Sequence, residues 1–126
     1  MAFLIDLPVE PRRELAARWQ SEETTDALYR SMTNGRLIRA HIESIDPLAL
    51  RIVTVLAGTS LSRGAIASRV AASDQRLDSV IAQLGKLGIV LGVPRDPVAP
   101  PRFIAPPFDS KRFYVPLDIA DQLRDR

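Results

Sequence analysis

Apolar residues in the first half of the chain recur every three or four positions, which is the spacing of amphipathic helices. The pattern predicts three short helices before residue 46. The first is expected to start near Pro8 or Pro11, since proline suits the first helical turn. The second follows Ser21, a suitable cap, and the third covers about 35–45. The side chains expected to face inward are Leu15, Ala16, Trp19, Leu28, Tyr29, Met32, Leu37, Ile38, Ile42 and Ile45.

A fourth helix is predicted at 47–57, where apolar residues fall on nearly every side, as in a helix at the centre of a core. Asp46 is a good N-cap acceptor, and Pro47 suits the first helical position. Gly58 follows, and glycine readily takes the left-handed conformation that ends a helix.

Two more helices are predicted at 63–70 and 74–87, with the turn Ala-Ala-Ser between them. Ser62 and Ser73 stand where an N-cap is needed, and both are residues that favour that position. The second helix has one continuous apolar stripe, made by Leu77, Val80, Ile81, Leu84 and Leu87. We expect this stripe to pack against the apolar helix at 47–57.

Beyond this helix the pattern becomes extended and rich in proline. Gly88 ends the helix, and the β-branched run at 89–93 is typical of a short strand. Six of the ten prolines lie within 92–111, and proline cannot donate to a sheet, so a long loop is expected there. Residues 112–115, Arg-Phe-Tyr-Val, predict a returning strand, and Pro116 opens a last short helix.

This order of elements resembles a winged helix-turn-helix domain. The resemblance covers about 46–116 and is carried by DPLALRIVTVLAG, LSRGAIASRVAAS, QRLDSVIAQLGKLGIVLGV and RFYVPLDIA. It implies a mainly α (α+β) fold with a two- or three-stranded wing. The expected organisation is an N-terminal helical extension at 1–45 and a winged domain at 46–126, with a long proline-rich wing at 92–111 and a short C-terminal helix.

A narrower likeness concerns LYRSMTNGRLIRAHIESIDPLALRIVTVLAG and the closing FYVPLDIADQL. These segments are similar to the helical and winged-helix accessory domain of bacterial XPB-like helicases, where such a module lies beside a DNA-translocating motor. The chain has no GxxxxGK[ST] loop and no acidic metal motif, so it cannot itself hydrolyse ATP. The likeness therefore implies an accessory module.

Composition and charge add to this reading. The 126 residues are 46% hydrophobic and 25% charged, which is typical of a folded domain. Cysteine is absent, which excludes disulfides and thiolate metal ligands. No apolar run approaches the roughly 20 residues of a membrane span, and the first residues lack the basic region of a secretory signal. We therefore expect a cytoplasmic protein.

The net charge of +2 is distributed unevenly. Residues 46–116 hold nine basic and five acidic residues, a net of +4, while 1–45 and 117–126 each sum to −1. This asymmetry favours a surface that faces a polyanion, with ordinary solvated charge as the alternative.

The winged-helix resemblance implies three sets of DNA-contacting residues. Arginine and glutamine on the recognition helix suit guanine and adenine edges, and helix starts suit phosphates. The recognition-helix set is Gln75, Arg76, Ser79, Gln83 and Lys86; the helix-start set is Ser62, Arg63 and Ser73; the wing set is Arg95, Arg102, Lys111 and Arg112. Against DNA binding, Asp74 and Asp78 make the recognition helix neutral, and Asp78 would repel phosphate unless it accepts from a cytosine amino group.

No catalytic, metal or cofactor site is expected. His41 is the sole histidine, and Glu43, two positions away, lies on a different helical face. The aromatic residues Phe103, Phe108, Phe113 and Tyr114 favour core packing over base stacking. The sequence thus predicts a non-enzymatic module that binds double-stranded DNA, as a transcription regulator or a nucleic-acid-processing accessory. The alternative is a protein-interaction module that docks a larger assembly such as a helicase, or a homodimer formed through the N-terminal helices; a sensor of small molecules ranks third.

Overall fold

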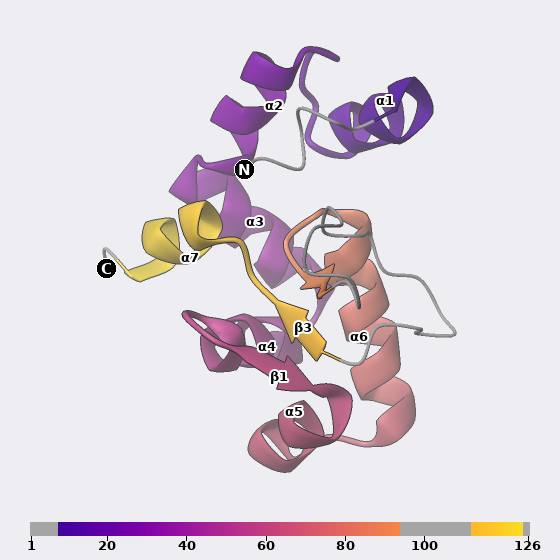
Figure 1. The fold of residues 1–126 in the computed structure, drawn as a ribbon, viewed down its shortest axis with the longest axis vertical. Coiled ribbons are helices and arrows are strands. Elements are labelled where there is room, and N and C mark those ends of the chain that lie inside the picture. Colours follow the sequence, from indigo (N-terminus) through magenta and orange to yellow (C-terminus); the bar gives the residue numbers. More distant parts are fainter. Residues whose placement is uncertain (1–7, 94–111, 125–126) are drawn as a thin grey trace.

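The computed structural model describes residues 8–93 and 112–124 (Figure 1). Within these ranges the fold is mainly helical with one small antiparallel sheet, as the sequence predicts. The elements in chain order are α1 (Val9–Arg18), α2 (Thr25–Met32), α3 (Gly35–Ile45), α4 (Pro47–Leu56), β1 (Ser60–Ser62), α5 (Arg63–Val70), α6 (Asp74–Lys86), β2 (Leu91–Gly92), β3 (Arg112–Tyr114) and α7 (Leu117–Arg124).

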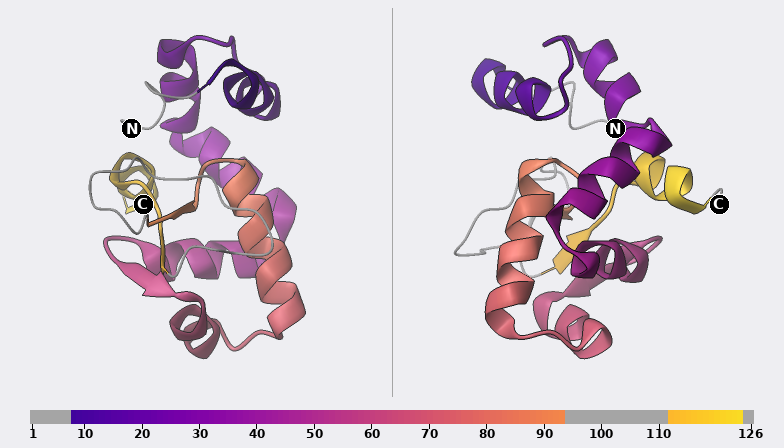
Figure 2. Two further views of the ribbon diagram at one scale, coloured as in Figure 1. Left: turned by 45° about the vertical axis from the view of Figure 1, so that its right-hand side comes forward. Right: turned by 180° about the vertical axis from the view of Figure 1, so that it is seen from behind.

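Helix α3 connects the two ends of the molecule. Helices α1 and α2 lie at one end and α5 lies at the other in every view (Figures 1 and 2). Helix α3 packs against α2, α4, α6 and α7, while α4 packs against both α5 and α6. The apolar interior is continuous from Leu15 in α1 to Ala120 in α7, so one core joins the N-terminal helices to the rest of the chain.

Capping side chains set most of the helix starts. The predicted caps Asp46, Ser62 and Ser73 are confirmed: each side-chain oxygen accepts a backbone N–H from the first turn of α4, α5 and α6, respectively. Ser21 was the wrong choice for α2, because Thr24 Oγ1 accepts from the backbone N–H of Ala27 at 3.2 Å. The Ser21 hydroxyl instead donates to the carbonyl of its neighbour Glu22.

The apolar stripe of α6 is buried against α4, as expected. The side chains of Leu77, Val80, Ile81 and Leu84 are at most 2% exposed, and α6 contacts α4 and α3. This packing leaves only the opposite flank of α6 to solvent, and so determines which of its residues are accessible.

Three apolar side chains are less buried than their pattern indicates. Tyr29 and Leu37 were expected to face inward but are 41% and 38% exposed. Each lies one residue from a buried position, and one residue turns a side chain by about 100° around the helix. Leu50 is 37% exposed, so α4 is not enclosed on every side.

The sheet has the strand order β1-β3-β2, with antiparallel pairing throughout. Phe113 of the central strand lies opposite Leu61 of β1 and Gly92 of β2, and its side chain is fully buried. Strand β1 is not apparent in the sequence because Ser-Leu-Ser is short and mostly polar. The strand predicted at 89–93 is also shorter: β2 covers only Leu91–Gly92, and the backbone N–H of Val93 adds one hydrogen bond to the Arg112 carbonyl of β3 at 3.0 Å.

The turns depend on left-handed backbone conformations. Gly58 and Gly88 have φ angles of 78° and 71°, as predicted for residues that end helices. Ala71, between α5 and α6, has a φ of 52°, a conformation that costs a residue with a Cβ about 1–2 kcal/mol. The packing of α5 and α6 therefore holds Ala71 in a conformation that is unfavourable for alanine by itself.

Candidate nucleic-acid interface

Four exposed polar side chains form a line along α6. Gln75, Ser79, Gln83 and Lys86 are all exposed, and at about 100° per residue they fall within a sector of about 80° on the helix. We call these four residues the α6 stripe. Their outward orientation agrees with the prediction, and the stripe contains two amides, a hydroxyl and a lysine but no carboxylate. Its groups can donate and accept hydrogen bonds without presenting negative charge.

Arg76, which the sequence assigns to a base contact, forms an ion pair with Asp46 in this structure. Its Nε and Nη2 atoms donate to the two carboxylate oxygens of Asp46 at 3.2 and 2.6 Å. The same carboxylate caps α4 by accepting from the Leu48 N–H at 2.8 Å. Hydrogen bonds from Arg76 and Leu48 hold the pKa of Asp46 below its usual value. The pair therefore ties the first turn of α6 to the junction between α3 and α4.

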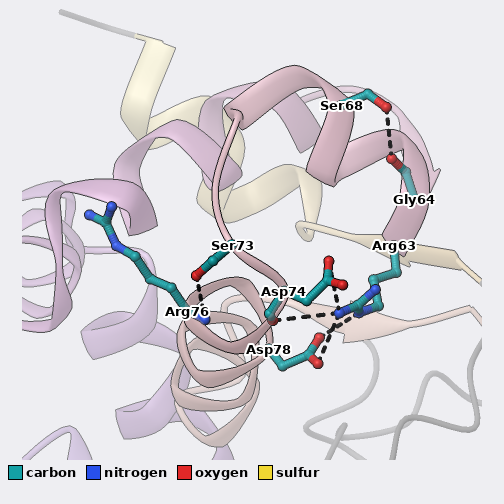
Figure 3. Close-up of polar contacts among 7 residues, drawn as sticks. All are labelled: Arg63, Gly64, Ser68, Ser73, Asp74, Arg76 and Asp78. Atoms are coloured by element: carbon teal, nitrogen blue, oxygen red, sulfur yellow. Dashed lines mark hydrogen bonds and ion pairs between the residues drawn. The ribbon is translucent and has the colours of Figure 1, made fainter.

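Arg63 forms a second ion pair on the other flank of α6 (Figure 3). Its guanidinium donates to both carboxylate oxygens of Asp78, with an Nη2–Oδ2 distance of 3.0 Å, and Nη2 lies 3.5 Å from Oδ1 of Asp74. The hydrogen bond to Asp78 raises the pKa of Arg63. Asp78 was expected to repel phosphate, but Arg63 offsets its charge and links the start of α5 to α6.

The two ion pairs lie on opposite flanks of the α6 stripe. In Figure 3 the Arg76 side chain extends away from Asp74 and Asp78, which face Arg63. The sequence did not reveal either pair, because the partners Arg76 and Asp46 are 30 residues apart and Arg63 and Asp78 are 15 apart. The sequence did show that α6 carries equal numbers of acidic and basic residues, a balance that favours ion pairing.

The remaining predicted contact residues are dispersed. Ser62 and Ser73 use their side-chain oxygens to cap α5 and α6. Arg112 joins β3 to β1 by donating to the Ser60 hydroxyl at 3.1 Å and to the Ser60 carbonyl at 2.6 Å. Of the other wing residues, Arg95, Arg102 and Lys111 lie outside the described residues, as do Phe103 and Phe108.

A hollow that the sequence did not indicate lies where α1, α3 and α6 meet. It has a volume of about 360 Å³ and is lined by Arg18, His41, Ser44, Ile45, Gln83, Lys86 and Leu87. Trp19 is buried beside it: its indole N–H donates to the Leu87 carbonyl at 2.9 Å, and its ring centroid is 4.4 Å from that of His41. We call this feature the α1–α6 hollow.

His41 gives the fold a specific dependence on pH. Partial burial lowers its pKa below the ordinary 6.5, so the unfolded chain takes up a proton at a higher pH than the folded chain. The free energy of unfolding should therefore fall as the pH drops from about 7.5 through 6.5 towards the folded pKa. Denaturant titrations at about pH 7.5 and 5.5 should show this fall. The variant His41→Gln should lose the part of this pH dependence that comes from the imidazole, whereas Ser44→Ala should retain it. An unchanged pH dependence of the unfolding free energy in His41→Gln would contradict this assignment.

Within residues 8–93 and 112–124, no cluster of three or more potential ligands is placed to hold a metal ion. No helix in the same ranges is long and apolar enough to cross a membrane. Comparisons with family models, curated proteins and solved structures found no match for this chain.

Proposed function

We propose that residues 46–116 form a winged helix-turn-helix unit and that the chain is a non-enzymatic module for binding double-stranded DNA. The order α4, β1, α5, α6, β2, β3 and the sheet order β1-β3-β2 support this proposal. In such a unit α5 and α6 are the two helices of the helix-turn-helix, and α6 is the recognition helix. The module would act as a transcription regulator or as an accessory to nucleic-acid processing.

The α6 stripe is the observation that carries the proposal. A helix of 13 residues is about 20 Å long, and the major groove of B-DNA is wide enough to admit it. The amides of Gln75 and Gln83 match the paired donor and acceptor of adenine, and lysine suits the acceptors of guanine. The ion pairs Arg63–Asp78 and Arg76–Asp46 then have a positioning role, since they fix α6 relative to α5 and α4.

The charge distribution sets the expected strength of binding. Arg63 and Arg76 are neutralised by carboxylates, so few cations of this surface remain to displace the counterions of DNA. Binding is therefore expected to be weak. The logarithm of the binding constant falls by about 0.9 per phosphate contact for each tenfold rise in salt, so binding should be visible at about 20 mM salt and lost by about 200 mM.

A charge-reversal pair tests the proposal. Lys86 belongs to the α6 stripe and Arg51 is an exposed cation on α4, so Lys86→Glu and Arg51→Glu change the net charge equally. Fluorescence anisotropy with a duplex of random sequence should show affinity falling by about tenfold for Lys86→Glu and by about twofold or less for Arg51→Glu. Absence of binding by the unaltered chain at low salt, or equal losses in both variants, would refute the proposed function.

A protein-docking role is the second candidate, and the exposed apolar side chains favour it. Tyr29 and Leu37 in the N-terminal helices are more exposed than expected, and Leu117 at the start of α7 is 64% exposed. These residues suit contact with a second copy or with a larger assembly such as a helicase. Sedimentation at about 10–100 μM distinguishes a homodimer; a monomer that binds DNA at low salt would favour the first role.

A further inference from the structure

The α1–α6 hollow combines a volume suited to a small molecule with polar groups that converge from three helices. Pockets for small ligands usually begin at about 300 Å³, and this one has about 360 Å³. Arg18 comes from α1, His41 and Ser44 from α3, and Gln83 and Lys86 from α6. No carboxylate is among the described residues that line it.

Its electrostatics favour an anion. Arg18 and Lys86 are exposed cations in the last turns of α1 and α6, where each faces a partial negative charge of about one half from its own helix. Two full positive charges exceed these two partial charges. Helix α3 also ends at the hollow, but α4 begins directly after it, so opposite helix ends adjoin at that point. The described residues that line the hollow therefore carry an excess of positive charge.

The remaining lining is apolar or planar. Ile45 and Leu87 provide apolar surface, and the His41 imidazole is a flat ring held against the buried Trp19. Because burial lowers the pKa of His41, the ring is neutral near pH 7.5 and can lie against an uncharged part of a ligand. A bare inorganic ion would leave this surface unused.

We propose that the α1–α6 hollow binds a small organic anion. A phosphate or carboxylate group would be held between the Arg18 guanidinium and the Lys86 ammonium, with hydrogen bonds available from Gln83. An aromatic or apolar body would lie against Ile45, Leu87 and the His41 ring. The bound molecule would join the N-terminal helix α1 to α6 across the hollow. The hollow shares Gln83 and Lys86 with the α6 stripe, whereas Arg18 and His41 lie outside the stripe, so a change at Arg18 tests the hollow alone.

The chain contains one tryptophan and one histidine, and both adjoin the hollow. The indole N–H of Trp19 and the ring protons of His41 therefore give unique NMR signals for ligand binding. We would titrate phenyl phosphate and benzoate into the isotope-labelled full chain at about pH 7.5, with inorganic phosphate and benzyl alcohol as probes of the anion alone and the aromatic body alone. At least one organic anion should shift both signals saturably, with a Kd below about 1 mM.

Two matched variants complete the test. Arg18→Gln should weaken binding of the organic anion by about tenfold, the effect of losing one charge-assisted hydrogen bond. Arg36→Gln removes an exposed arginine from the start of α3 and should leave the affinity unchanged. The proposal is overturned if neither organic anion gives a saturable shift, if inorganic phosphate or benzyl alcohol binds as tightly as the organic anions, or if both variants behave alike. DNA binding measured on Arg18→Gln separates these outcomes from failure of the proposed function.

Discussion

Replacing Trp19 with alanine is expected to lower the free energy of unfolding by about 3–5 kcal/mol, the usual cost of removing a buried tryptophan. The side chain is 2% exposed, packs against the His41 ring and donates its indole N–H to the carbonyl of Leu87. Alanine would leave a cavity between α1 and the end of α6 and would leave that carbonyl without its indole donor. Such a loss is a large part of the 5–15 kcal/mol typical of a domain.

Chemical denaturation followed by far-ultraviolet circular dichroism measures this effect, since Trp19→Ala removes the fluorescent reporter. The free energy of unfolding of Trp19→Phe should lie between those of the unaltered chain and Trp19→Ala, because phenylalanine keeps much of the apolar volume but cannot donate to Leu87. Tyr29→Ala removes a largely exposed aromatic ring from α2 and should cost less than about 1 kcal/mol. If Trp19→Ala were no more destabilising than Tyr29→Ala, the contact between α1 and the rest of the core would not contribute to stability as described.

Replacing Leu77 with alanine is expected to cost about 2–5 kcal/mol. The side chain is fully buried on the face of α6 that packs against α4, so its removal opens a cavity beneath the recognition helix of the proposed winged unit. Leu50→Ala is the matched control, because Leu50 lies on α4 but is 37% exposed. It should lose less than about 1.5 kcal/mol, since only part of its surface is removed from water.

The same denaturation experiment compares the two leucine variants. Equal losses of unfolding free energy for Leu77→Ala and Leu50→Ala would mean that the buried apolar face of α6 does not hold the helix against α4. Hydrogen exchange adds a local measurement: amides of α6 should exchange faster in Leu77→Ala than in Leu50→Ala, because the helix loses an anchor on its buried face.

The helices and most of their caps were predictable because their signals are local. Asp46-Pro47, Ser62 and Ser73 each lie next to the backbone that they cap. The buried apolar residues of α6 likewise recur within a single helix. The inward assignment of Tyr29 and Leu37 failed because a sequence pattern gives the centre of a buried face but not its width. That width depends on how closely neighbouring helices pack.

The features that define the candidate site were not predictable, because they join distant parts of the chain. Arg76 and Arg63 were assigned to DNA from their place on helices, and nothing in the sequence indicated their ion pairs because the carboxylate partners come from other elements. The α1–α6 hollow likewise needs α1, α3 and α6 to be assembled before its lining can be recognised. Strand β1 is defined only by its pairing with β3, which follows it by about 50 residues.

The central position of β3 has a consequence for the order of folding. The contacts of α4 with α3, α5 and α6 all lie within the segment that ends at Lys86, so a ribosome-bound nascent chain can collapse around them early. Both β1 and β2 must wait for β3, which follows β1 by about 50 residues and β2 by about 20 residues in the chain. Closing so long a contact is entropically costly and slow relative to helix packing. Until that late step, the open edges of β1 and β2 are the part of the nascent protein most exposed to misassembly.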